Sequence, residues 1–255
     1  MEYGICSLSA ITCKAESNHK SEQINQLLFG EFYTILEKTA DWYKISAAYD
    51  SYEGWIHRKH HTLIDENEFE MLTLEKPERS LDTFGIVTDS SNAFSSNIPL
   101  GSSLPFFNSG KLKLNGSELN YSGKISEQNF SNCTQYAKMY LNTPYLWGGR
   151  TPMGIDCSGF VQMTFKLCGI KLRRDSKDQA LQGNTIEKLA DAKTGDLVFF
   201  GNETKVNHVG MLLDNSTVIH ASGKVKMEKI DEKGIFGNVE KDYTHFLKSI
   251  KRIIP

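Results

Sequence analysis

The stretch Asp156-Cys157-Ser158-Gly159-Phe160 places a cysteine directly after a residue that favours helix starts. An aspartate at this position accepts hydrogen bonds from the first N–H groups of a helix. Apolar residues then recur at helical spacing, which predicts a half-buried helix beginning at Cys157. They are Phe160, Val161, Met163, Phe165, Leu167 and Cys168. The helix dipole and the unpaired N–H groups are expected to lower the thiol pKa from about 8.5, priming Cys157 as a nucleophile.

Two histidines follow this cysteine in stretches typical of β-strands. Residues 197–200 are predicted to form one strand, and residues 208–213 and 217–221 an antiparallel pair around Asp214-Asn215-Ser216. A two-residue loop would put His208 and His220 on opposite faces, whereas a three-residue loop pairs 213 with 217 and puts both on one face. We predict the three-residue loop. A thiol, an imidazole and a second ring are the nucleophile, base and orienter of a cysteine hydrolase.

Five blocks of sequence, in this order, resemble the NlpC family of papain-like cell-wall peptidases. They are Tyr-Leu-Trp-Gly-Gly at 145–149, Asp-Cys-Ser-Gly-Phe at 156–160, Gly-Asp-Leu-Val-Phe-Phe at 195–200, His-Val-Gly-Met at 208–211 and Val-Ile-His-Ala at 218–221. The resemblance covers roughly the last half of the chain and implies a papain-like catalytic domain over residues 126–255. It makes Cys157 the nucleophile, His208 the general base and acid, and His220 the ring that orients His208.

The same resemblance implies residues that hold the substrate. Tyr145 matches the family tyrosine whose hydroxyl helps the Cys157 backbone N–H hold the oxyanion. Residues 173–176, Arg-Arg-Asp-Ser, resemble the Pro-Arg-Asp-Ser block that lines the cleft in one subgroup, with Arg173 in place of proline. The candidate substrate-binding residues in this half of the chain are Asp156, Ser158, Trp147, Asp175 and Ser176.

Several of these residues also have purely structural interpretations. Ser176-Lys177-Asp178-Gln179 fits a helix capping box, so Asp175 and Ser176 could act only as caps. Tyr145 and Trp147 could be core aromatics, and His220 an ordinary strand histidine.

Other cysteines and histidines are expected to have structural positions. Free cysteine is often buried, so we assign packing roles to Cys6, Cys13, Cys133 and Cys168. No cysteine or carboxylate partner stands at zinc spacing from the histidines His57, His60 and His61, which we place in a solvated turn. We therefore expect no metal and no cofactor.

The first half of the chain has the short, evenly spaced β-rich stretches of a small barrel, at 27–37, 42–48 and 54–56. Its Gly30-Glu31 and Gly54-Trp55-Ile56 resemble the start and end of a bacterial SH3-like domain, which we place at residues 1–65. Acidic residues 65–70 are predicted to be a linker. Residues 66–125, with a hairpin at 110–116, are interpreted as a second, diverged SH3-like barrel. Helical spacing over 126–141 would open the catalytic domain. The predicted fold class is α+β.

Composition limits the classes of function. The chain has 255 residues, of which 39% are hydrophobic and 24% charged, with a net charge of −2, which argues against nucleic acid as a partner. No stretch approaches the roughly 18 apolar residues of a membrane span. Met1-Glu2-Tyr3 opens no signal peptide, and five cysteines without a disulfide spacing favour a reducing, cytoplasmic compartment. An exported or periplasmic protein is the alternative if a leader is missing from the sequence.

Barrels followed by an NlpC-like domain resemble the γ-D-glutamyl-L-diamino acid endopeptidases, which cleave peptidoglycan stem peptides. The resemblance implies that Cys157 attacks the γ-amide carbonyl and that the enzyme serves murein peptide recycling. An amidase or acyltransferase on the same scaffold, or a wall-binding module, are the alternatives. The sequence leaves open whether the third stem residue is diaminopimelate or lysine, and it leaves the oligomeric state open.

Selection of the substrate is expected to depend on its free N-terminal L-Ala amine. A buried cation needs carboxylate and hydroxyl partners, because leaving it unpaired costs several kcal/mol. Glu31 and Tyr52 fall where related endopeptidases carry barrel residues that close the cleft, so the first barrel is predicted to cap the site. Tyr52 could instead be an exposed turn residue.

Overall fold

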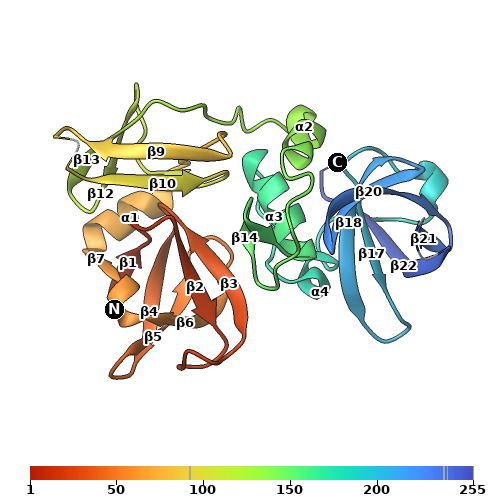
Figure 1. Cartoon of the computed structure of the whole chain (residues 1–255), viewed down its shortest axis with the longest axis horizontal. Helices are drawn as coiled ribbons and strands as arrows, with labels where there is room; N and C mark the ends of the chain where they lie inside the picture. The colour runs from red at the N-terminus through yellow and green to blue at the C-terminus, as the bar shows by residue number, and fades with distance from the viewer. Residues whose placement is uncertain (92, 238, 240, 255) are drawn as a thin grey trace. The chain divides into compact units, whose positions relative to one another are not determined.

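A computed structural model of the chain describes residues 1–91, 93–237, 239 and 241–254 (Figure 1). By contacts between residues it divides into two units. The first holds residues 1–128 together with 148–152, and the second holds residues 129–147 and those from 153 onward. The domain boundaries expected at residues 65 and 125 stay predictions of the sequence. Among the described residues, no helix combines the length and the apolar character that crossing a membrane requires.

The first unit opens with a seven-stranded antiparallel sheet in the order β3-β2-β6-β5-β4-β1-β7. Its strands are β1 (Glu2–Ile5), β2 (Ala10–Lys14), β3 (Gln23–Leu28), β4 (Phe32–Lys38), β5 (Trp42–Ala47), β6 (Glu53–His57) and β7 (Thr62–Ile64), with a 3₁₀ turn η1 (Arg58–His60). The stretches predicted at 42–48 and 54–56 correspond to single strands, β5 and β6. The stretch predicted at 27–37 is divided between β3 and β4. Gly30 separates them because its φ of +74° is a left-handed conformation that glycine adopts easily.

Two local predictions in this region were wrong. The expected linker at 65–70 is the start of helix α1 (Glu66–Leu74), because Asp65 accepts a hydrogen bond from the Glu68 N–H as an N-cap. His61, expected in a solvated turn, lies 3.0 Å by its Nδ1 from the Tyr33 hydroxyl, and only 10% of its side chain is exposed.

The rest of the first unit is a second, smaller set of strands. They are β8 (Glu78–Arg79), β9 (Phe84–Asp89), β10 (Ser95–Pro99), β11 (Ser103–Leu104), β12 (Lys111–Leu114) and β13 (Ser117–Tyr121). Four form a sheet in the order β10-β9-β13-β12, and β8 pairs with β11. The predicted hairpin is confirmed, because β12 and β13 pair across Asn115-Gly116, whose positive φ angles suit a tight turn. The interpretation of residues 66–125 as a diverged barrel stays a prediction.

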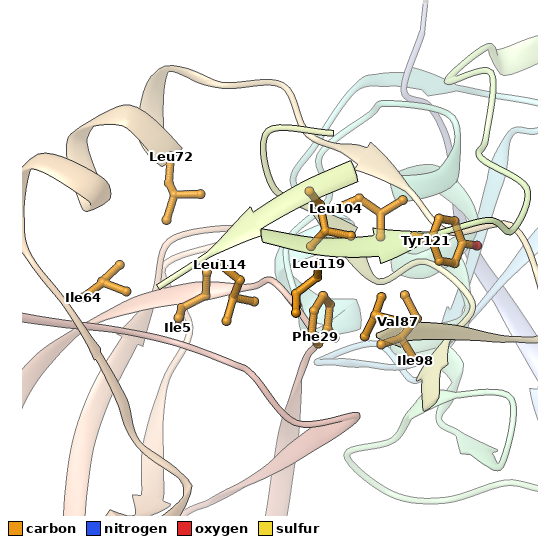
Figure 2. Close-up of a cluster of buried hydrophobic side chains, with 11 residues drawn as sticks. Ile5, Phe29, Ile64, Leu72, Val87, Ile98, Leu104, Leu114, Leu119 and Tyr121 are labelled. Atoms are coloured by element: carbon orange, nitrogen blue, oxygen red, sulfur yellow. The ribbon is translucent and has the colours of Figure 1, made fainter. Parts of the chain in front are cut away.

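The two parts of the first unit share one hydrophobic core (Figure 2). Ile5 and Phe29 come from the first sheet, Leu72 from α1, and Val87 and Tyr121 from the smaller sheet. Because one core supports both, residues 1–125 are expected to fold together rather than as independent modules.

The second unit begins with less helix than the sequence predicted. A 3₁₀ turn, η2 (Phe130–Asn132), leads into α2 (Cys133–Lys138), whereas residues 126–129 are not helical. Gln128 has a φ of +49°, a left-handed conformation that an α-helix does not contain. The predicted helix at 126–141 is therefore confirmed only in its second half.

The remaining elements of the second unit are the strands of one closed sheet, the short strand β15 and the helices α3, α4 and η3. They are β15 (Gly154–Ile155), α3 (Cys157–Leu167), α4 (Ser176–Gln179), β16 (Asn184–Ile186), η3 (Leu189–Asp191), β17 (Leu197–Gly201), β18 (Val206–Asp214), β19 (Thr217–Ser222), β20 (Lys224–Asp231), β21 (Gly234–Gly237) and β22 (Asp242–Arg252). The sheet order is β16-β22-β17-β18-β19-β20-β21, and β21 also pairs with β22, which closes the strands into a barrel (Figure 1). Helix α3 packs on β18 and β19, which brings Cys157 to the strands that carry the two histidines.

Candidate active site

Cys157 is the first residue of α3, as the sequence predicted. Asp156 is the N-cap, with extended backbone angles, and its Oδ1 accepts a hydrogen bond of 2.6 Å from the Gly159 N–H. All eleven residues of the helix are buried, so it is a core helix rather than the half-buried one expected. This rigid packing fixes the position of Cys157.

The protonation state of Cys157 differs from the expectation. Burial, together with the smaller effect of the Asp156 charge, raises the pKa of the Cys157 thiol to about 12. The backbone N–H groups of Val209 and Ser158 hydrogen-bond the sulfur and lower the pKa by less. Desolvation and the neighbouring carboxylate therefore outweigh the helix terminus, and the resting nucleophile is a thiol rather than a primed thiolate.

The strand register places both histidines on one face, as predicted. Gly210 pairs with His220 and Leu212 with Val218, so His208 is diagonal to His220 on the same side. The turn itself differs from the expected three-residue loop. Asp214 pairs with Thr217 after a bulge at Leu213, so a two-residue turn and a bulge together give the predicted register.

Gly210 makes room for His220 across the strand pair. A Cβ atom at Gly210 would lie 2.6 Å from Val218 Cγ2 and 3.0 Å from His220 Cβ. Real Cβ atoms rarely approach so closely, so only glycine fits opposite His220 without displacing it. This gives the His-Val-Gly sequence of β18 a physical reason.

The two imidazoles form a buried hydrogen-bonded pair. His208 Nε2 lies 2.8 Å from His220 Nδ1, and the two side chains come from β18 and β19. Burial, together with His220, lowers the pKa of His208 well below its ordinary value. His208 is therefore an uncharged imidazole at neutral pH, which is the form that accepts a proton.

Two residues around this pair were missed by the sequence analysis. Glu228 on β20 contacts His220 through a 2.8 Å distance between Oε2 and Nε2. His245 on β22 lies with its ring centre 4.3 Å from that of His208. Neither belongs to a sequence block that suggested chemistry. Glu228 comes to the site because β20 pairs with β19, and His245 because β22 pairs with β17, which pairs with β18.

The candidate substrate-binding residues next to the nucleophile are held by Arg174. Its guanidinium donates to both oxygens of Asp156, at 3.0 and 2.5 Å, and to Ser158 Oγ at 2.9 Å. All three side chains are buried. Arg174 thus balances the charge of Asp156 and orients the Ser158 hydroxyl beside Cys157.

Asp175 and Ser176 lie at the start of α4. Asp175 is the N-cap and Ser176 the first helical residue, so the expected capping box with Ser176 as the cap is wrong. The Asp175 side chain makes no capping hydrogen bond, and its carboxylate lies 3.8 Å from Lys177 Nζ. Helix α4 has only four residues, and its start is set by the Gln179 N–H bonding the Asp175 carbonyl.

Tyr145 and Trp147 precede the nucleophile in the second unit. Burial raises the pKa of Tyr145, and the Cys157 and Asp156 charges raise it too. The Tyr145 backbone bridges to Ile155, two residues before the nucleophile. Trp147 is 57% exposed, which excludes a core role. An exposed aromatic ring offers an apolar surface to a ligand.

Glu31 and Tyr52 belong to the first unit. Glu31 is buried and receives the Arg150 guanidinium on both oxygens, at 2.7 and 2.9 Å, and the Leu28 N–H at 3.0 Å. Tyr52 is partly exposed in the turn between β5 and β6, where its N–H donates to Asp50. Their predicted contact with substrate stays a prediction.

Three imidazoles could offer nitrogen ligands to a metal ion. One nitrogen from each of His208, His220 and His245 lies within 4.8 Å of the others. However, both His220 nitrogens already face hydrogen-bonding partners, His208 and Glu228. A metal would have to displace one of them, so this geometry suits proton transfer better than metal binding.

A cysteine at a helix start, with an uncharged imidazole and a second orienting ring, is the arrangement of a cysteine-nucleophile hydrolase. Two family models match this sequence. The NlpC/P60 family matches residues 142–243, and the bacterial dipeptidyl-peptidase Sh3 domain matches residues 15–60.

Proteins with similar sequences or structures include dipeptidyl-peptidases and an NlpC/P60 family protein. A gamma-D-glutamyl-L-lysine dipeptidyl-peptidase of Bacillus subtilis (strain 168) is 40% identical over 90 residues, 34% of this chain and 30% of that protein. Dipeptidyl-peptidase 6 of Lysinibacillus sphaericus is 27% identical over 253 residues, 86% of this chain and 88% of that protein. A solved NlpC/P60 family protein from Bacillus cereus ATCC 10987 shares the fold, with a TM-score of 0.82 at 20% identity over 99% of this chain and 100% of that one.

The chain belongs to the NlpC/P60 family of cysteine peptidases. The predicted α+β fold, an NlpC catalytic domain preceded by an SH3-like domain, is confirmed. The chain spans less than a third of the B. subtilis relative and most of the L. sphaericus relative.

Proposed function

We propose that this protein is a cysteine endopeptidase that hydrolyses the γ-D-glutamyl bond to the diamino acid in peptidoglycan stem peptides. The observation that supports it most is the buried His208–His220 pair on β18 and β19, next to a Cys157 sulfur that faces the Val209 N–H. The dipeptidyl-peptidase names of its relatives suggest the bond that is cut.

In this proposal, Cys157 Sγ attacks the γ-amide carbonyl while its proton passes to His208. The Cys157 N–H and the Tyr145 hydroxyl hold the negative oxygen that develops, because a helix-start N–H has no partner within its own helix. His208 then gives the proton to the leaving amine of the diamino acid, and a thioester remains on Cys157. Water activated by His208 hydrolyses the thioester and restores the thiol.

We further propose that the enzyme acts on peptides with a free N-terminal L-Ala. Carboxylates and hydroxyls are the partners that an ammonium group needs, and the candidates in the second unit are Asp156, Ser158, Asp175 and Ser176, with Trp147 offering an apolar surface. Acetylating the amine should lower kcat/KM by about two orders of magnitude, the loss of a charge-assisted pair.

The test is mass spectrometry of products from L-Ala-γ-D-Glu peptides with diaminopimelate or lysine, each with a free and an acetylated amine. Release of L-Ala-D-Glu from the free peptides alone supports the proposal. Equal cleavage of blocked and free peptides would remove the selectivity and favour hydrolysis of the intact wall. Transfer to an added amine, or deamidation without backbone cleavage, would show an acyltransferase or an amidase.

The nucleophile is tested separately. Cys157→Ala should abolish turnover and leave the fold intact. Iodoacetamide should label Cys157 before the other four cysteines, although all five are buried, because in this proposal His208 takes the Cys157 proton. Preferential labelling of Cys133 or Cys168 would contradict the assignment of Cys157.

A further inference from the structure

Glu228 lies beyond the two histidines and extends their hydrogen-bonded line. On β20, Lys226 stands directly opposite His220, and Glu228 opposite Val218. Side chains two residues apart on a strand share a face, so Lys226 and Glu228 both point to the side occupied by the His220 ring. Glu228 Oε2 lies 2.8 Å from His220 Nε2 and 3.0 Å from Lys226 Nζ.

Glu228 is ionised in this setting. The hydrogen bond from His220, with Lys226 beside it, lowers the pKa of Glu228 to about 2. A carboxylate only accepts hydrogen bonds, so the proton between the two groups must sit on His220 Nε2. Burial lowers the pKa of His220 although Glu228 opposes this effect, so the ring carries a single proton at neutral pH.

The remaining protons follow from this first one. With its proton on Nε2, neutral His220 has a lone pair on Nδ1 and can only accept there. The 2.8 Å contact between His220 Nδ1 and His208 Nε2 then requires a proton on His208 Nε2. Neutral His208 is left with a lone pair on Nδ1, the nitrogen that is free to take the thiol proton.

We propose that Glu228 is a positioning residue that sets the tautomer of His220 and, through it, that of His208. Without the carboxylate, His220 could carry its proton on Nδ1 and donate it to His208 Nε2. His208 would then hold its proton on Nδ1 and could not accept one from Cys157. This inference rests on the proposed cysteine peptidase function and assigns a role to a residue outside the family's sequence blocks.

The expected effect can be scaled from related chemistry. In serine protease triads, replacing the orienting carboxylate by an amide keeps the geometry but lowers kcat about 10⁴-fold, because the wrong tautomer forms. In this protein one ring separates Glu228 from the base, so we expect a loss of about 10- to 100-fold.

The experiment compares Glu228→Gln and Glu228→Ala with the unaltered protein by kcat, KM and ¹⁵N NMR of the imidazole nitrogens. We expect a lower kcat at unchanged KM, and a shift of the His208 proton from Nε2 toward Nδ1. Glu232→Gln is the matched control, because within the described part of the chain its carboxylate accepts a hydrogen bond from the Leu189 N–H and none from the histidine pair. Lys226→Met removes the other partner of Glu228 and should leave the tautomers unchanged.

The pH profile of kcat is a second readout. Besides Glu228, the groups that face the histidine pair and can affect this profile are His245 and Lys226.

In a His220→Gln background, Glu228→Ala should cause no further loss of kcat, because the relay is already interrupted. Unaltered tautomers in both Glu228 variants, or full additivity with His220→Gln, would overturn the proposal. The NMR measurement reports the imidazole protons whether or not the protein cleaves a peptide. An unchanged tautomer would therefore contradict this proposal without contradicting the peptidase function. If Glu228→Ala does not fold, Glu228→Gln and the NMR comparison decide the question.

Discussion

His208 and His220 have different roles although both are buried in the same barrel. His208 is placed to exchange a proton, whereas both ring nitrogens of His220 face hydrogen-bonding partners, His208 and Glu228. His208→Ala should therefore cost nearly as much as Cys157→Ala, about 10⁴-fold or more in kcat, since residues that act as a unit are not additive.

His220→Gln is expected to leave measurable activity, because a glutamine oxygen can still accept from His208 Nε2. Steady-state kinetics of the single and double variants measures both effects. Near-normal kcat in His208→Ala would exclude it as the base.

The shifted pKa values of the two reacting groups predict the pH profile. The active form holds His208 neutral and Cys157 as a thiol, and burial favours both. Because the pKa of His208 is lowered, kcat/KM should fall only as the pH drops below its ordinary value of about 6.5. Because the pKa of Cys157 is raised to about 12, no fall should appear near pH 8.5.

Measuring kcat/KM from about pH 5 to about pH 10 distinguishes this neutral pair from a preformed ion pair. The rate of iodoacetamide labelling of Cys157 should still be rising at pH 9. A labelling rate that is flat above neutrality would show that a thiolate exists at rest, as the sequence alone had suggested.

At the scale of elements, the pairing of β18 with β19 controls the site through Gly210. Gly210→Ala would insert a methyl group against Val218 and His220. Overpacking of this kind costs about 1–3 kcal/mol, and here the displaced group includes an active-site ring. We expect a lower melting temperature and a kcat reduced roughly tenfold, since small misplacements slow catalysis.

Thermal unfolding and kinetics of the same protein preparation separate the two effects of Gly210→Ala. A variant with reduced stability but unchanged kcat would show that Val218, not His220, absorbs the strain. Such a result would limit the role of Gly210 to packing.

At the scale of the whole molecule, a short segment that precedes the nucleophile in the sequence belongs to the first unit. Residues 148–152 fold with residues 1–128, although the chain on either side belongs to the second unit. Arg150 is fully buried there and pairs with Glu31 through two hydrogen bonds, while its backbone N–H donates to Gln26. The first unit is therefore incomplete without a segment from the second half of the sequence.

Glu31→Ala should destabilise the protein by about 3–5 kcal/mol, because it leaves the Arg150 charge buried and unpaired. Chemical denaturation measures the loss. Glu118→Ala is the matched control, since it breaks the exposed Lys111–Glu118 pair in the same unit and should have no measurable effect. Similar losses of unfolding free energy in both variants would show that the buried Glu31–Arg150 pair stabilises the protein no more than an exposed pair.

Local patterns in the sequence determined the parts of the site that depend on near neighbours along the chain. The aspartate cap set the start of α3 at Cys157, and strand alternation put His208 and His220 on one face, because capping and alternation act over a few residues. The helix at 66–74 was missed because the acidic stretch was interpreted as a linker although Asp65 caps the helix locally, and the helix at 133–138 is shorter than predicted because Gln128 has a left-handed backbone.

Only the tertiary structure decided which groups surround these residues and in what charge state. Glu228, His245 and Arg174 reach the site because β20, β22 and the segment after α3 come together on folding. Burial, which no local pattern specifies, made Cys157 a thiol and His208 a neutral base. Hydrogen-bond partners and desolvation depend on residues that are distant in sequence, and so the chemistry of this site is a property of the folded chain.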